Sequence, residues 1–200
     1  DQSFFAFAEQ MLHRFRETSQ VMQVSGYNFL PDQHFLGYSY CFSHWGFSWG
    51  WATWRRAWQL FDRDMSLWPT VLRDGLDQVY PFMPYICRVF EETYQGRIDT
   101  WDYQWQFAKT IHSGLSIIPA TNLIQNIGFG CDATHTKSKN HPRAQLQAQA
   151  LDFPIKHPDY ILVNPQYDRA IVSSFSPQIP ITAKVRGKIR QIMRSLFGGN

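Results

Sequence analysis

Segments with helical periodicity alternate with short apolar segments along this chain, and this alternation constrains the fold more than any other feature. Residues 3–16 place six apolar side chains on one helical stripe, with Ser3 as the expected cap: Phe4, Phe5, Ala8, Met11, Leu12 and Phe15. The sequence VMQVSGYNF at residues 21–29 is typical of a strand that Gly26 ends or bends. Because helices and strands take turns, we expect an α/β fold.

The later segments continue the alternation. HFLGYSYCF at 34–42 and LSIIPATNLI at 115–124 predict two more strands, the second ended or bent by Pro119. ATWRRAWQLFD at 52–62 predicts a helix, and a looser helix is expected over 70–80, broken by Pro81 and Pro84. A further helix is expected to begin at Asp99 and to run to about Ser113, where Gly114 stops it.

Composition narrows the class of protein. The 200 residues are 44% hydrophobic and 18% charged, which is typical of a folded, water-soluble domain. No apolar run reaches the length of a membrane span, and no signal-peptide pattern opens the chain. The cysteines, Cys41, Cys87 and Cys131, are odd in number and far apart, which favours reduced thiols and a cytoplasmic location.

The charge is unevenly distributed. Residues 137–200 hold ten Lys or Arg against three Asp, a balance of +7, which leaves about −4 for residues 1–136. The main body therefore gives no support to nucleic-acid binding. Residues 181–200 intersperse basic and apolar side chains, so they form either a peripheral contact with the anionic inner membrane face or a solvated helix on their own domain.

The sequence RIDTWDYQW, residues 97–105, combines two carboxylates with two indoles. Asp102 falls in the first turn of the expected helix, where the exposed N–H groups favour an ionised carboxylate. Such a group beside a pocket can act as a general base, with Asp99 as the reserve candidate, while Trp101 and Trp105 suit the apolar faces of sugar rings. The alternative is structural: the two carboxylates only cap the helix, and the indoles only fill the core.

Two glycine-containing loops supply the other candidates. In SHWGFSWGWATWRRAW at 43–58, Trp49 and Trp51 flank Gly50, so one ring can line a pocket while the other packs inward. In NIGFGCDATHT at 126–136, His135 is a candidate ligand for Mn²⁺ or a similar metal, although a lone histidine in a polar loop is more often simply exposed to solvent.

These stretches, in this order, resemble the second half of bacterial GT-A glycosyltransferases of the family-two type, often described as nucleotide-diphospho-sugar transferases or haemolytic-protein-like proteins. The motifs are WGWATWRRAW, then DTWDYQW, then SIIP…NLIQNIGFGCDATHT, within residues 1–136. More remotely, their order is similar to that of the N-acetylglucosaminyltransferase I group.

The resemblance implies a nucleotide-sugar donor, a divalent metal (Mn²⁺ or Mg²⁺) and inversion at the anomeric carbon. By position, Asp102 matches the base, His135 the late histidine of the metal site, and the segment Trp49 to Trp51 the lining of the sugar pocket, with Trp101 beside it. The implied fold is an incomplete GT-A fold: an acceptor-side half with a mixed sheet and flanking helices in residues 1–136, and a basic extension with a helical tail in 137–200.

The chain departs from the family at its start, because the nucleotide-binding strands and the Asp-x-Asp motif that precede the SFF helix are absent. We therefore expect a fragment or an incomplete site. Two other functions stay open. A non-catalytic carbohydrate-binding or interaction module would use the tryptophan loop alone. A glycoside hydrolase would need two carboxylates across one sugar, for which only Asp99 and Asp102 are candidates.

Overall fold

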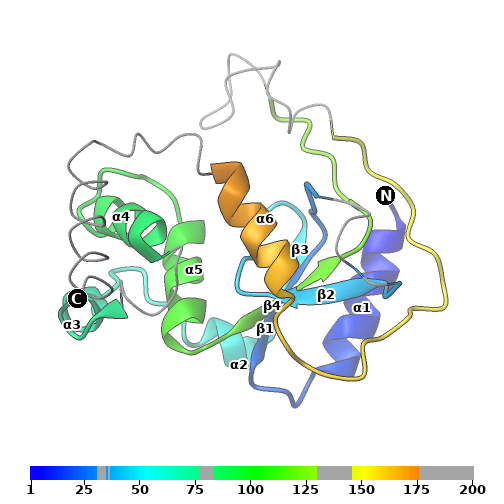
Figure 1. The fold of residues 1–200 in the computed structure, drawn as a ribbon, viewed down its shortest axis with the longest axis horizontal. Helices are drawn as coiled ribbons and strands as arrows, with labels where there is room; N and C mark the ends of the chain where they lie inside the picture. The colour runs from blue at the N-terminus through cyan, green and yellow to red at the C-terminus, as the bar shows by residue number, and fades with distance from the viewer. Residues whose placement is uncertain (31–34, 36, 77–82, 130–145, 176–200) are drawn as a thin grey trace, which may run out of the picture.

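The computed structural model describes residues 1–200 except 31–34, 36, 77–82, 130–145 and 176–200. Its centre is a four-stranded mixed sheet in the order β2-β4-β1-β3 (Figure 1). The strands are β1 (Val21–Ser25), β2 (Tyr40–Ser43), β3 (Trp51–Ala52) and β4 (Leu115–Pro119). Helices flank this sheet, so the expected mixed α/β class is confirmed.

The central strand pair is parallel and the outer pairs are antiparallel. β4 runs parallel to β1, with Val24 opposite Ile117, and antiparallel to β2, with Cys41 opposite Ile118. β3 is a short antiparallel edge on β1. Every residue of β1, β2 and β4 is buried. Burial on both sides is what helices covering both faces of a sheet produce.

Two of the three apolar cores of the described residues lie on opposite faces of the sheet, because side chains alternate along the strands. Phe42 and Ile117 point into the core under α1 (Ser3–Arg14), whereas Cys41 and Ile118 point into the opposite core. The second core is covered by α3 (Trp68–Arg73), α4 (Met83–Tyr94), α5 (Asp102–Ile111) and α6 (Pro165–Phe175). In Figure 1, α6 crosses in front of the sheet, and α3, α4 and α5 lie together on the left.

Several sequence expectations about helices were wrong. The helix expected at 52–62 is only α2 (Arg55–Trp58), because residues 51 and 52 pair with β1 as β3. The looser helix expected over 70–80 is seen as α3, and the last four positions of that range lie outside the described residues. Ser3 does not cap α1; its Oγ instead accepts a hydrogen bond from the Leu151 N–H.

The start and end of α5 differ from expectation in a way that matters for the site. The helix begins at Asp102 with Trp101 at the N-cap, so Asp99 lies outside the helix and caps nothing. At the other end, Ser113 takes the left-handed conformation (φ 54°). Gly114 is needed for space, since a Cβ there would lie 2.1 Å from Met22 Sδ.

Residues beyond 146 also pack on the sheet. Leu151 and Ile155 join the core under α1, while Tyr167 and Ile171 of α6 join the opposite core. The division at residue 136 stays a prediction, and the helical tail expected at 181–200 lies outside the described residues. Within the described part of the chain, no helix has the length and apolar character needed to cross a bilayer.

Candidate functional site

A cavity of about 160 Å³ lies where the first turn of α5 meets the loop between β2 and β3. Half of the residues that line it are aromatic, and one is a carboxylate. The lining residues are Tyr27, Trp45, Gly46, Phe47, Ser48, Trp49, Ile86, Asp102, Tyr103 and Gln106.

Polar side chains of β1 hold the loop at residues 44–50 in place. Gln23 Nε2 donates to the Phe47 carbonyl at 2.9 Å, and the Phe47 N–H donates to Ser25 Oγ at 3.1 Å. From the other side, Gln106 Nε2 of α5 donates to the His44 carbonyl at 2.9 Å. These bonds satisfy buried polar groups and fix the loop between sheet and helix, so the cavity wall is preformed.

Asp102 is half-buried and lines this cavity. Its Oδ2 accepts a hydrogen bond from Ser48 Oγ at 3.1 Å, and its Oδ1 accepts one from Thr100 Oγ1. An ionised carboxylate has about four acceptor positions, so these two neutral donors orient the group and leave capacity for a ligand hydroxyl. The carboxylate therefore lines the cavity and does not cap the helix.

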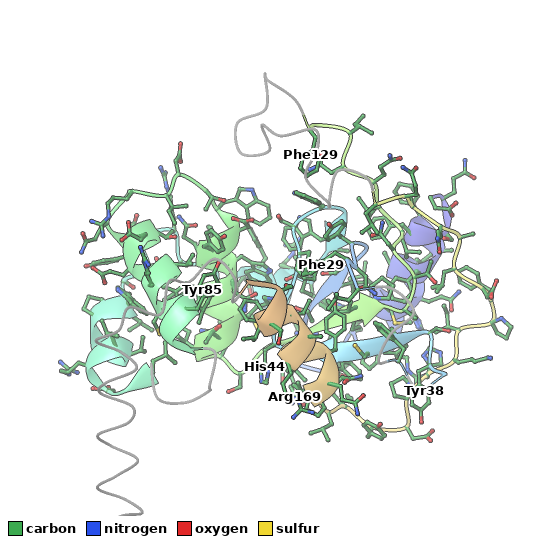
Figure 2. The ribbon with its side chains drawn as sticks, turned by 45° about the horizontal axis from the view of Figure 1, so that its top comes forward. Phe29, Tyr38, His44, Tyr85, Phe129 and Arg169 are labelled. Atoms are coloured by element: carbon green, nitrogen blue, oxygen red, sulfur yellow. The ribbon has the colours of Figure 1, made fainter. Side chains whose placement is uncertain are left out.

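Trp49 and Trp51 point into different surroundings, as their spacing around Gly50 predicts. Trp49 lines the cavity, with its ring 4.7 Å from that of Tyr27 and 5.6 Å from that of Phe129, which Figure 2 labels on the loop at the top. Gly50 turns the chain with φ +57°, and a Cβ there would lie 2.3 Å from Ile124 Cδ1. Trp51 therefore leaves the cavity.

Trp51 belongs to a group of five rings that we call the indole cluster: Trp51, Trp58, Phe61, Trp101 and Trp105. Trp51 stacks on Trp101 with centroids 5.2 Å apart and 30° between the planes. Trp105 is buried, whereas Trp101 remains 42% exposed. Trp101 and Trp51 are thus brought together, but in a group beside the cavity rather than in its wall.

Two predicted site residues are not part of this arrangement. Asp99 is exposed and is not among the residues that line the cavity. His135 lies outside the described residues. In the described ranges no group of three His, Cys, Asp or Glu side chains could hold a metal, and Asp102 alone does not fit a divalent cation.

Lys109 is a feature that the sequence analysis missed. Asp102, Gln106 and Lys109 lie on one face of α5, and Lys109 is completely buried behind the cavity. Its Nζ donates to Ser116 Oγ at 2.7 Å, and a Cβ on Gly46 would lie 2.4 Å from that nitrogen. Burial lowers the pKa of Lys109 to about 7, although the charge of Asp168 acts in the opposite direction. A lysine at this helical spacing from Asp102 was the available signal.

A second polar group was also missed. His44 Nδ1 lies 2.7 Å from Asp168 Oδ2 of α6, and Ser43 Oγ donates to the other oxygen of the same carboxylate. Figure 2 places His44 beside α6. These contacts join residues more than a hundred positions apart and hold α6 on the sheet. No local sequence motif predicts them.

Arg56 of α2 has a structural role. Its guanidinium lies over Trp54 and donates to five backbone carbonyls where the chain passes from α1 to β1, namely those of Phe15, Arg16, Thr18, Ser19 and Val21. Every nitrogen of its guanidinium donates in these hydrogen bonds, so Arg56 does not place a positive charge in the cavity.

No family model, no curated protein and no solved structure matches this chain.

Proposed function

We propose that the protein is an inverting glycosyltransferase that moves a sugar from a nucleotide-diphospho-sugar to a hydroxyl acceptor. The single observation that carries this proposal is the half-buried carboxylate of Asp102 in an aromatic-walled cavity. A sugar offers apolar C–H faces to the rings and hydroxyl groups to the carboxylate, which matches pockets that combine apolar walls with a few placed polar groups.

In the proposed reaction Asp102 accepts the proton of an acceptor hydroxyl while the oxygen attacks the anomeric carbon. The new bond between carbon and acceptor oxygen forms as the bond to the donor's diphosphate breaks, and the nucleoside diphosphate leaves with the electron pair. Ser48 and Thr100 keep the carboxylate aimed into the cavity. General-base assistance of this kind supplies about 10²–10⁴-fold in rate.

The remaining parts of the proposal rest on the resemblance of the sequence. They are an acceptor-side GT-A half in the mixed sheet, an acceptor that is a bacterial surface glycan or a lipid-linked sugar, and Mn²⁺ or Mg²⁺ with His135 among its ligands. Trp49, Gly50, Trp51 and Trp101 are proposed to surround the sugars, and this part is supported by their position in or beside the cavity wall.

Calorimetry tests the proposal against the chief alternative, a non-catalytic carbohydrate-binding module. UDP-, GDP- and dTDP-sugars are titrated with and without Mn²⁺, and neutral oligosaccharides are titrated alone. A glycosyltransferase is expected to bind one nucleotide sugar in a metal-dependent way. Glycan binding without any nucleotide or metal dependence contradicts the proposal and favours the binding module, which the exposed faces of Trp58 and Trp101 also support.

A glycoside hydrolase is a weaker candidate. The chemistry needs two carboxylates across one sugar ring. Among the described residues that line the cavity, Asp102 is the single carboxylate, and Asp99 is exposed elsewhere.

A separate part of the proposal concerns the basic segment 181–200. We propose that the protein is cytoplasmic and that this segment makes a peripheral contact with the inner face of the membrane. Alternating basic and apolar side chains are expected to hold the segment on anionic lipid. Co-sedimentation with phosphatidylserine-containing liposomes measures this for the full chain and for a chain ending at residue 180. Equal pelleting of the two chains rules out the membrane contact.

A further inference from the structure

The indole cluster exposes aromatic surface that packing alone does not require. Trp58 is 40% exposed and Trp101 is 42% exposed, with Phe61 and Trp51 partly buried between and beneath them. Contiguous exposed apolar surface on a folded protein marks an interaction site more often than scattered single side chains do. These exposed rings are therefore a candidate ligand-binding surface.

The rings are held rigidly before any ligand arrives. Trp58 lies parallel to Phe61, with centroids 4.5 Å apart and 7° between the planes. Beneath them, Trp105 is buried and its Nε1 donates to Gln23 Oε1 at 3.0 Å. A ligand that stacks on surfaces already fixed in place loses less affinity to ordering than one that must organise them.

The cluster is continuous with the cavity through two segments of backbone. Trp101 directly precedes Asp102, whose carboxylate lines the cavity, and Trp51 follows Trp49 after the turn at Gly50. The ring centroids of Trp101 and Trp58 are 6.2 Å apart. A ligand that begins beside Asp102 and extends past the start of α5 can therefore reach Trp101, and Trp58 lies next to Trp101.

We propose that the acceptor is a glycan of at least two sugar units, whose terminal hydroxyl meets Asp102 while the preceding units stack on Trp101 and Trp58. This inference rests on the proposed function for the role of Asp102. A pyranose has an apolar face and a rim of hydroxyls, so it can cover an indole while its rim stays hydrated. An indole face likewise suits a partner that is apolar on one side and wet on the other.

The test compares matched monosaccharides and trisaccharides on the full chain. Glucose and maltotriose, N-acetylglucosamine and chitotriose, and mannose and mannotriose are titrated by calorimetry and by tryptophan fluorescence. At least one trisaccharide is expected to bind about tenfold more tightly than its monosaccharide, which corresponds to a difference in binding free energy of about 1.4 kcal/mol. Absence of a length preference in all three pairs overturns the proposal.

Three variants assign the effect to the cluster. Trp58→Ala is expected to remove the length preference, whereas Trp58→Phe keeps a ring and is expected to retain most of the preference. Phe5→Ala is the matched control, because Phe5 is an exposed ring on α1. An unaltered preference in a folded Trp58→Ala protein, verified by its thermal melting curve, contradicts the assignment.

Other outcomes separate this inference from the proposed function. Metal-dependent nucleotide-sugar binding without a trisaccharide preference leaves the glycosyltransferase standing and removes the extended acceptor. A trisaccharide preference without any nucleotide-sugar binding keeps the sugar surface and removes the transferase. Binding to phosphatidylcholine vesicles in place of trisaccharides, lost in Trp58→Ala, replaces the glycan with a lipid surface and overturns the inference.

Discussion

Asp102→Asn is expected to lower the rate of sugar transfer by about 10²–10⁴-fold while leaving the affinity for the nucleotide sugar nearly unchanged. An amide has nearly the same shape as a carboxylate but cannot take a proton from the acceptor hydroxyl. Ser48 and Thr100 contact different oxygens of Asp102, so in the variant one hydroxyl can still donate to the amide oxygen and the other can accept from the amide nitrogen, and the cavity is expected to keep its form. Initial rates of transfer and calorimetric titration of the donor measure the two effects separately.

Asp99→Asn is the matched control for this experiment. Asp99 is close to Asp102 in sequence and carries the same charge, but it is exposed and outside the cavity. We expect its transfer rate to stay near that of the wild type. Wild-type turnover in Asp102→Asn eliminates Asp102 as the base, and a collapse confined to Asp99→Asn would move the role to that residue.

Lys109→Met is expected to stabilise the fold most at low pH, with the benefit falling as pH rises above about 7. Unfolded lysine has a pKa of about 10.4, whereas burial lowers the pKa of Lys109 to about 7 in the folded protein. Between these values the unfolded state binds the extra proton, so wild-type stability rises with pH. The slope is at most about 1.4 kcal/mol per pH unit, and the methionine variant lacks it.

Denaturant unfolding of both proteins at several pH values between 6 and 9 measures this difference. The gain in free energy of unfolding from Lys109→Met is expected to shrink by up to about 3 kcal/mol from pH 7 to pH 9. Asp168 and its partner His44 are the charged or titratable groups near Lys109 that remain in both proteins. Burial also raises the pKa of the Cys41 thiol, but this contribution is common to both and cancels in the difference.

Lys156→Met serves as the control, since Lys156 is exposed. Its free energy of unfolding is expected to follow the wild-type pH dependence. If the difference between wild type and Lys109→Met does not change with pH, Lys109 does not lose its proton within the fold.

The sequence predicted three of the four strands, because each of those three has a local signature, whereas the two-residue strand β3 was missed. β1, β2 and β4 are short apolar segments near Gly or Pro, and all three lie where the pattern places them. The pattern failed for α4, because a break at Pro81 and Pro84 predicts no helix that begins there. Proline is tolerated in the first turn of a helix, where no N–H partner is needed, and α4 begins at Met83 with Pro84 next.

The site shows the same division between local and distant information. Asp102 and Trp49 are prominent in short motifs, and both line the cavity. The contact of Lys109 with Gly46 and that of His44 with Asp168 join segments far apart in the chain. A linear pattern contains no signal for such pairs, because they depend on how the strands are ordered in the sheet.

The strand order β2-β4-β1-β3 also dictates when the protein can fold. β1 and β2 do not pair with each other: β4 lies between them, and before β4 is made β1 can pair only with the two-residue strand β3 in this sheet. During synthesis at about 5–20 residues per second, several seconds pass between the emergence of β2 and that of β4. Over that interval β2 and one edge of β1 lack the strand that lies between them, so the nascent chain is open to aggregation or to chaperone capture until residues 115–119 leave the ribosome.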